Sequence, residues 1–222
     1  FISFLHISKS KMDKHAADMF APSGRIAISL SVYPVVTEFL SGVCGCGPAM
    51  SGVIVSEIDI TKSKYASSLW KLAGLDVASD GRGRSRRKEH LVKATYTNAD
   101  GEEAERDSIT FNPFLKTKLM GVLAASFIKI GEARSPYAKI YRDYKHRLEN
   151  HAVHGIANDA VRIAEFKEKG QRYAPKGHRH NMAMRYMIKQ FLVDLYKAWR
   201  TLEGLEVFAP YQEAKLGHVH KD

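Results

Sequence analysis

The last part of the chain carries a long helical pattern that any fold must accommodate. Between His180 and Gly204, apolar residues recur three or four positions apart, the spacing of one face of an α-helix. This stripe consists of Met184, Met187, Ile188, Phe191, Leu195, Trp199 and Leu202. A helix of this length has to bury its stripe against other elements. We therefore expect a helical domain built around this segment, with its methionines and aromatic rings in the core.

Six shorter helical patterns and one strand pattern precede this segment. The helices are expected at residues 33–40, 49–58, 67–75, 112–131, 135–149 and 159–169. Asn112 and Pro113 mark the start of the longest, as a capping residue followed by proline at the first helical position. Residues 90–103 instead resemble a strand followed by a turn, with Asp100-Gly101 suited to a β-hairpin. These patterns predict a small β-ribbon inserted in a mainly α domain.

The turn SGVCGCGP, residues 41–48, joins the first two of these helices. This order predicts a helix-hairpin-helix unit, in which backbone N–H groups near Gly45 and Gly47 contact a phosphate. Glycine allows the close approach, and the dipole of the following helix favours an anion. A glycine-rich turn between two core helices is the alternative. The predicted fold class is thus mainly α, a helix-hairpin-helix-containing helical domain with a small β-ribbon insertion.

The chain carries 34 lysines and arginines against 24 aspartates and glutamates, a formal charge of +10. Such an excess is typical of nucleic-acid-binding proteins. No stretch approaches the roughly 20 apolar residues of a membrane span, so no membrane partner is expected. The two cysteines, Cys44 and Cys46, lie too close for an ordinary disulfide and lack the further ligands of a zinc site. We expect a protein of the reducing cytoplasm.

Three parts are expected along the chain. Residues 1–32 show no sustained pattern and are predicted to be a poorly structured lead or the end of a preceding domain. Residues 33–206 form the helical domain, and residues 207–222 form a tail. The chain begins at Phe1 rather than at methionine, and we expect it to be a fragment that lacks an N-terminal part.

Five cations are concentrated in seven residues of the segment ASDGRGRSRRKEH. They are Arg82, Arg84, Arg86, Arg87 and Lys88. Like charges at this spacing repel one another, so solvent or an anion has to compensate them, and a phosphate backbone is the obvious anion. Ser85 lies among them, where the cations could hold a phosphodiester while the hydroxyl attacks phosphorus. His90 is near in sequence, but no histidine has an evident triad spacing, and a solvated surface loop is the alternative.

Two of the predicted helices add further cations. Lys116 and Lys118 lie on the polar side of the helix at 112–131, and Arg179 and Arg185 surround the start of the last helix. Cations at a helix N-terminus oppose its dipole, which favours a nearby anion. These four side chains are predicted to contact DNA phosphates, with a solvated helix end as the alternative for the second pair. No metal site is expected in this chain, because its HxH pairs lack a third ligand.

Five motifs in a fixed order resemble one known arrangement. They are GVCGCGPAMSGVIVSEID, KYASSLWKLAGLD, DGRGRSRRK, ITFNPFLKTKLMGVLAASF and HNMAMRYMIKQFLVDLYKAWR. The set spans about residues 33–204 and is similar to the C-terminal transposase domain of the insertion-sequence one-ten family, whose members are guided by a bridge RNA. Residues 96–103 look like an insertion relative to shorter members of that family.

This resemblance implies a serine nucleophile in the loop that follows Gly74-Leu75. Ser85 is the favoured candidate because cations adjoin it. Ser79 is the alternative, since the loop departs from the serine- and glycine-rich pattern of the family. Members also use magnesium, held by acidic residues of a separate RNase H-like N-terminal domain, and no cofactor is expected in the present chain. DNA, a bridge RNA and further copies of the same chain are the implied partners.

The resemblance therefore predicts a DNA transposase whose serine cleaves and exchanges strands during transposition. The alternative is a non-catalytic nucleic-acid-binding module or a decayed transposase remnant, because such a protein would keep the same basic surfaces. Covalent attachment to DNA distinguishes the two classes, since only the enzyme forms a phosphoserine-linked end.

Overall fold

The structure, a computed structural model, describes residues 29–170 and 175–209. Within these residues it is mainly helical and has one two-stranded antiparallel sheet, as the sequence predicts. Most of the predicted lead 1–32 and of the predicted tail 207–222 lies outside the described residues. The α-helices are α2 (Pro34–Glu38), α3 (Pro48–Glu57), α4 (Ala66–Leu72), α5 (Pro113–Thr117), α6 (Ala124–Ile130), α7 (Pro136–Glu149), α8 (Asp159–Glu168) and α9 (Pro175–Leu202). The strands are β1 (Val92–Thr97) and β2 (Glu103–Ser108).

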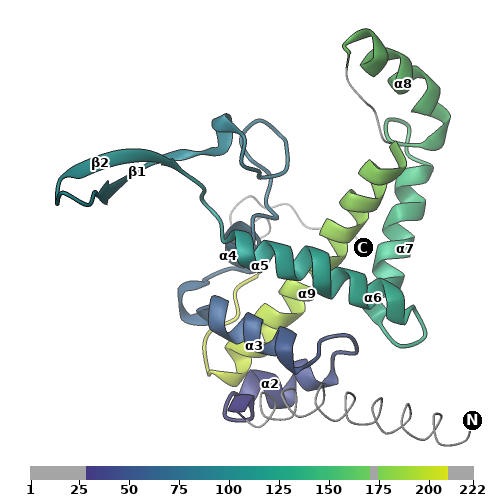
Figure 1. The fold of residues 1–222 in the computed structure, drawn as a ribbon. Coiled ribbons are helices and arrows are strands. Elements are labelled where there is room, and N and C mark those ends of the chain that lie inside the picture. The colour runs from purple at the N-terminus through teal and green to yellow at the C-terminus, as the bar shows by residue number, and fades with distance from the viewer. Residues whose placement is uncertain (1–28, 171–174, 210–222) are drawn as a thin grey trace, which may run out of the picture.

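Helix α9 is the element against which several of the other helices pack (Figure 1). It packs along α7 and also contacts α2, α4 and α6. The buried part of the predicted stripe comprises Met187, Ile188, Phe191, Leu195 and Trp199. The buried stripe is shorter than predicted at both ends, since Met184 is only partly buried and Leu202 is 38% exposed. The helix begins at Pro175 rather than at His180, and proline is well suited to that first position.

Polar groups fix the chain around α4 against α9. The Trp70 indole N–H donates to the Lys189 carbonyl oxygen over 3.2 Å. The buried Arg200 guanidinium donates to the carbonyl oxygen of Ser63 over 3.0 Å, and Ser63 lies six residues after the end of α3. The first bond uses a carbonyl group of α9 itself, and the second satisfies a buried carbonyl group that lies far from α9 in sequence. They hold the start of the basic loop, which follows α4, beside the middle of α9.

The helix predicted at 112–131 is continuous but not uniform. Asn112 caps α5, because its side chain accepts the Leu115 N–H over 2.9 Å, and Pro113 occupies the first position as predicted. A π-helical segment, Lys118–Leu123, then connects α5 to α6. The predicted length of the helix is therefore confirmed, but its π-helical segment was not predicted. A π-helical turn contains more residues than an α-helical turn, so it changes which side chains share a face of the helix.

The β-ribbon extends away from the helices (Figure 1). Its register runs from the Val92–Ser108 pair to the Thr97–Glu103 pair, and Gly101 at the turn has a φ of +84°. The first strand begins at Val92, two residues later than expected, because Lys88–His90 forms a short 3-10 helix. Most strand residues are exposed or only partly buried on both faces. The predicted ribbon is therefore present as a projecting arm.

The predicted helix-hairpin-helix region contains α2, a 3-10 turn at Leu40–Gly42, a glycine-containing loop and α3. Both helices are short, with 5 and 10 residues. The helical content is as expected, but the arrangement does not by itself define a helix-hairpin-helix motif. Over the described part of the chain, no helix combines the length and the apolar character needed to cross a membrane.

Two glycines that follow helices, Gly74 after α4 and Gly204 after α9, provide a matched test of packing. Each glycine follows its helix with φ near +60° (+62° and +66°) and lies in the same pair of closing hydrogen bonds. A Cβ at Gly74 would lie 2.6 Å from Phe111 Cγ, whereas one at Gly204 would meet nothing within 4 Å. We expect alanine to cost about 1–2 kcal/mol of unfolding free energy at each position from backbone strain, and about 1–3 kcal/mol more in Gly74→Ala from the overlap with Phe111. Urea denaturation measures both, and equal losses would contradict the packing described.

Candidate functional site

The basic loop between α4 and β1 is folded, not a loose surface segment. The Arg84 N–H donates to the Asp76 carbonyl oxygen over 3.0 Å, and the Ala78 N–H donates to the Arg82 carbonyl oxygen over 2.8 Å. Gly81, with a φ of +75°, allows the chain to reverse between these two bonds. The Asp80 carboxylate accepts the Arg82 N–H over 2.9 Å and closes the turn. The predicted alternative of an unstructured, solvated loop therefore does not describe this segment.

This fold brings Ser85, His90 and Asp80 into one hydrogen-bonded series. Ser85 Oγ lies 3.1 Å from His90 Nδ1, and His90 Nε2 lies 3.1 Å from Asp80 Oδ2. The His90 ring is buried, whereas Ser85 is partly exposed. Sequence spacing gave no sign of this series, because an irregular loop, not a helix or strand, places the three side chains.

The hydrogen bonds also assign the roles of the two ring nitrogens. The Ser85 backbone N–H donates to His90 Nδ1 over 3.0 Å, so that nitrogen carries a lone pair. In the neutral ring the proton is then on Nε2, which faces Asp80. The Arg82 N–H and His90 hold the pKa of Asp80 below its ordinary value, which favours the carboxylate. Nδ1 is thus placed to take the Ser85 hydroxyl proton, and Asp80 to stabilise the resulting imidazolium.

One of the five loop cations is committed to an ion pair. Arg84 Nη2 lies 2.7 Å from Asp76 Oδ2, and Arg84 Nε also contacts the carboxylate. Both side chains are about one-fifth exposed (20% each), so the pair is partly shielded from solvent. Arg84 therefore anchors the loop, and the predicted phosphate contact at this residue is not supported by its geometry.

Helices α5 and α9 bring three more cations to the base of the loop. Lys116 Nζ donates to the Arg84 carbonyl oxygen over 2.8 Å, which places it one peptide unit from Ser85. On α9, Arg185 and Lys189 lie on the same face, one turn apart. Each of the three is only partly exposed. No ion pair with an acidic side chain is found for any of them in the described structure.

The electrostatic effect of this crowding is visible in the pKa values. Burial and the neighbouring Arg185 lower the pKa of Lys116 to about 8. Burial likewise lowers the pKa of Arg185, and burial followed by repulsion from Arg185 lowers that of Lys189. The pKa values fall because the charged forms are poorly solvated and repel one another. An anion at this position would relieve both effects.

Gly83 explains how Arg185 comes so close to the loop. A Cβ at Gly83 would overlap the Arg185 guanidinium, whereas the glycine leaves room for it. The glycine is therefore needed for a close approach rather than for a left-handed backbone. This contact joins the middle of α9 to the segment that immediately precedes Ser85.

The remaining loop cations are exposed and lie around the serine. Arg82, Arg86, Arg87 and Lys88 have no acidic partner among the described residues. Lys118 does not belong to this group, because two positions along a helix turn it away from Lys116. Ser79 is exposed in the turn, without a hydrogen bond to His90 or any other described group. The geometry therefore favours Ser85 over Ser79.

The prediction for Arg179 is not supported by its surroundings. Its side chain is 5% exposed and its Nη1 lies 2.9 Å from Asp159 Oδ1. The same Nη1 also donates to the His154 carbonyl oxygen over 3.3 Å. Arg179 thus fixes the start of α8 to α9, and it has no free face for a phosphate. The partner carboxylate is twenty residues away in sequence, so the helix-end argument could not anticipate the pair.

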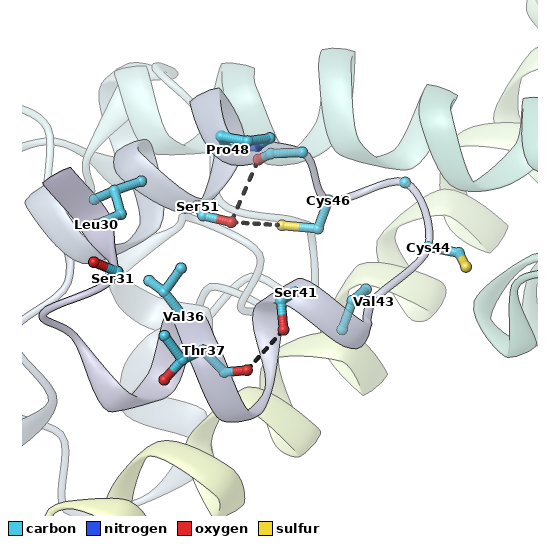
Figure 2. Close-up of a pocket in the computed structure, with 12 residues that line it drawn as sticks. Leu30, Ser31, Val36, Thr37, Ser41, Val43, Cys44, Cys46, Pro48 and Ser51 are labelled. Atoms are coloured by element: carbon cyan, nitrogen blue, oxygen red, sulfur yellow. Dashed lines mark hydrogen bonds between the residues drawn. The ribbon is translucent and has the colours of Figure 1, made fainter. Parts of the chain in front are cut away.

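The glycine turn before α3 also differs from the predicted phosphate cradle. Gly45, with a φ of +100°, packs inward, where an added Cβ would lie 3.0 Å from side-chain atoms of Phe127 and Ile130. Gly47 is exposed at the start of α3. Figure 2 shows the hollow beside this turn, which has a volume of about 580 Å³. Its lining residues include no lysine or arginine, so it does not resemble a site for a polyanion.

The cysteines and the acidic side chains near the basic loop are not arranged as metal ligands in the described structure. Both cysteines are free, and burial raises the pKa of the Cys46 thiol to about 11, which keeps it protonated. Across the described ranges, His, Cys, Asp and Glu side chains form no group of three that could hold a metal ion. Asp76 and Asp80 are engaged by Arg84 and His90. These residues do not fit a magnesium site, and we derive no step through a metal.

Comparisons with other proteins add no assignment. No family model matches the chain, and no curated protein and no solved structure matches it. The site is therefore defined by its own geometry: a serine–histidine–aspartate series with half-buried cations behind it and exposed cations around it. The residues that sequence reasoning missed are His90 and Asp80 as partners of Ser85.

The lowered pKa of Lys116 predicts a pH dependence of DNA binding. The free protein loses this charge as pH rises through about 8, whereas a bound phosphate favours the charged form. The DNA-bound state then holds the extra proton, so affinity falls as pH rises above about 8, by up to about tenfold per pH unit for one coupled proton. Titrations of DNA from pH 7 to pH 9.5 measure the effect. Lys116→Arg keeps the charge and should flatten the curve, and an identical curve would contradict the assignment.

Proposed function

We propose that this chain is a DNA transposase domain that supplies Ser85 as the nucleophile for strand cleavage and exchange. The observation that carries the proposal is the contact of Ser85 Oγ with the lone pair of a buried histidine, beside cations that lack acidic partners. Positive charge binds and polarises a phosphodiester, and a positioned base activates the hydroxyl. The resemblance to the insertion-sequence one-ten transposases supports the same reaction class.

The proposed reaction is an attack of the Ser85 hydroxyl on a DNA phosphodiester. Ser85 Oγ forms a bond to phosphorus while its proton moves to His90 Nδ1. The bond from phosphorus to one deoxyribose oxygen breaks, and that oxygen takes up a proton from Lys116 or from water. Arg185 and Lys189 offset the negative charge that develops on the non-bridging oxygens. The product is a phosphoserine-linked DNA end, which a strand hydroxyl can attack in the reverse sense to complete the exchange.

DNA binding in this proposal depends on two layers of charge. The exposed loop cations contact phosphates along the strand, and the half-buried group holds the phosphate that reacts. A bridge RNA, further copies of the chain and a magnesium-binding N-terminal domain belong to the proposal through the family resemblance alone. A cytoplasmic location follows from the same assignment. Of the two glycines predicted to contact a phosphate in the helix-hairpin-helix interpretation, only Gly47 remains in this proposal. Its exposed backbone at the start of α3 offers an additional phosphate contact.

Single alanine variants test the nucleophile. The complete protein is incubated with guide RNA and target DNA, and covalent protein–DNA species are trapped under denaturing conditions. Ser85→Ala should abolish the trapped species, because no other described hydroxyl faces His90 Nδ1. Ser79→Ala is the matched control from the same loop and should retain it within about twofold, since surface changes away from the chemistry have small effects. Trapping that persists in Ser85→Ala would overturn the assignment.

The binding-module alternative predicts the same DNA affinity without a covalent species. His90→Gln separates the two classes further, since loss of the base should lower the rate of strand cleavage by about 100-fold or more while DNA binding changes little. If the wild-type complex binds DNA and RNA tightly but never yields an adduct, the alternative function is the better assignment.

Salt dependence tests the outer layer of charge. The logarithm of DNA affinity should fall linearly with the logarithm of salt concentration, because each neutralised phosphate releases about one counterion. Arg86→Ala should weaken binding with little change in sequence preference and lower the magnitude of the slope by about one. Arg142→Ala is the matched control, because this exposed arginine is already paired with Glu132 at 3.0 Å. Equal slopes for wild type and Arg86→Ala would contradict the assigned contact.

A further inference from the structure

A second hollow lies between α7 and α9, away from the basic loop. These helices run side by side (Figure 1), and the hollow has a volume of about 400 Å³. It is lined by Ile140, Asp143, Tyr144, Arg147, Tyr186 and Gln190. The site of strand cleavage described above uses none of these residues.

The walls of this hollow are two stacked tyrosines. The ring centroids of Tyr144 and Tyr186 are 4.2 Å apart, and their planes differ by 16°. The Arg147 guanidinium carbon lies 4.6 Å from the Tyr144 centroid. Both rings are only partly buried, unlike the core rings of Phe127 and Phe191, so they retain accessible surface. Tyrosine rings with an adjacent guanidinium form the kind of surface on which nucleobases stack.

The polar groups of the hollow are available to a ligand. Among the described residues, neither the two tyrosine hydroxyls nor the Gln190 amide has a hydrogen-bond partner. An amide offers two donors and an acceptor, which suits the edge of a base. Asp143 is already engaged, since its carboxylate lies 2.6 Å from Lys139 Nζ. Arg147 has no acidic partner in the described chain and leaves the hollow with free positive charge.

The hollow adjoins the half-buried cations through α9. Tyr186 directly follows Arg185, and Gln190 directly follows Lys189. Consecutive helical residues point about 100° apart, so the ring-bearing face and the cation-bearing face of α9 are neighbours. A strand with phosphates on the cation face can place a base on the tyrosine face. Base-paired DNA cannot do so, because its bases are stacked within the duplex.

We propose that the α7–α9 hollow binds an unpaired nucleobase of a single-stranded nucleic acid, stacked on the Tyr144–Tyr186 pair and contacted at its edge by Gln190. This site goes beyond the proposed cleavage function, because stacking needs neither Ser85 nor His90. A purely structural stack that holds α7 against α9 would bind no base, and this difference defines the experiment.

The decisive comparison uses the unmodified chain and two forms of one oligonucleotide. Fluorescence anisotropy compares a short single strand with the same strand containing abasic sites, which keeps every phosphate and removes the bases. We expect the abasic strand to bind about fivefold to a hundredfold more weakly, the range for loss of stacking on aromatic side chains. Parallel DNA and RNA strands show which sugar the site prefers. Equal binding of intact and abasic strands of both kinds would overturn the proposal.

Matched variants then locate the effect. Tyr186→Leu keeps apolar volume and should remove most of the difference between intact and abasic strands, with circular dichroism confirming the helical content. Tyr96→Leu on the ribbon is the control, because that ring also has an arginine over it, Arg106 at 5.0 Å, but no second ring. Ser85→Ala should leave the difference unchanged, so failure of the cleavage function is distinguishable. A base preference that persists in a folded Tyr186→Leu protein would place the stacking elsewhere and contradict the proposal.

Discussion

The ion pair between Arg84 and Asp76 is the contact on which the candidate site depends. Its closest atoms are 2.7 Å apart and each side chain is 20% exposed, so the attraction is less screened than at a fully exposed surface pair. The pair holds the backbone of the basic loop in place against the repulsion between its cations. The Arg84 carbonyl oxygen then accepts from Lys116, and the next residue, Ser85, reaches the His90 ring. One salt bridge thus positions both the nucleophile and the nearest cation behind it.

The half-buried cations behind Ser85 lower the stability of the free protein, but their position suits the binding of an anion. Lys116, Arg185 and Lys189 lose solvation on α5 and α9. Asp76, the nearby carboxylate among the described residues, is engaged by Arg84. Such a group destabilises the free protein and becomes favourable once an anion is bound. Groups of this kind with shifted pKa values gather at functional sites more often than elsewhere. The physical arrangement therefore argues for an anionic ligand independently of any resemblance.

The local sequence pattern was sufficient to predict the regular helices. It was insufficient where contacts between distant parts of the chain determine the position of a side chain. The spacing of apolar residues predicted the buried stripe of α9, and Asn112 with Pro113 predicted the start of α5. The concentration of positive charge in the sequence predicted the basic loop as a phosphate-binding site and Ser85 as the candidate nucleophile. It could not reveal His90 and Asp80 as partners, because irregular backbone brings them together. It also placed Arg179 on the surface, where a carboxylate from a different helix in fact buries it.

In the proposed mechanism His90 already activates the Ser85 hydroxyl in the free chain, and a fluorophosphonate probe tests this without DNA. Attack by Ser85 Oγ would form a bond to phosphorus, expel fluoride and pass the hydroxyl proton to His90. Mass spectrometry of the digested chain locates the adduct. We expect labelling at Ser85 that disappears in His90→Gln and is unaffected in Ser79→Ala. An unlabelled Ser85, or labelling that is equal with and without His90, would contradict it.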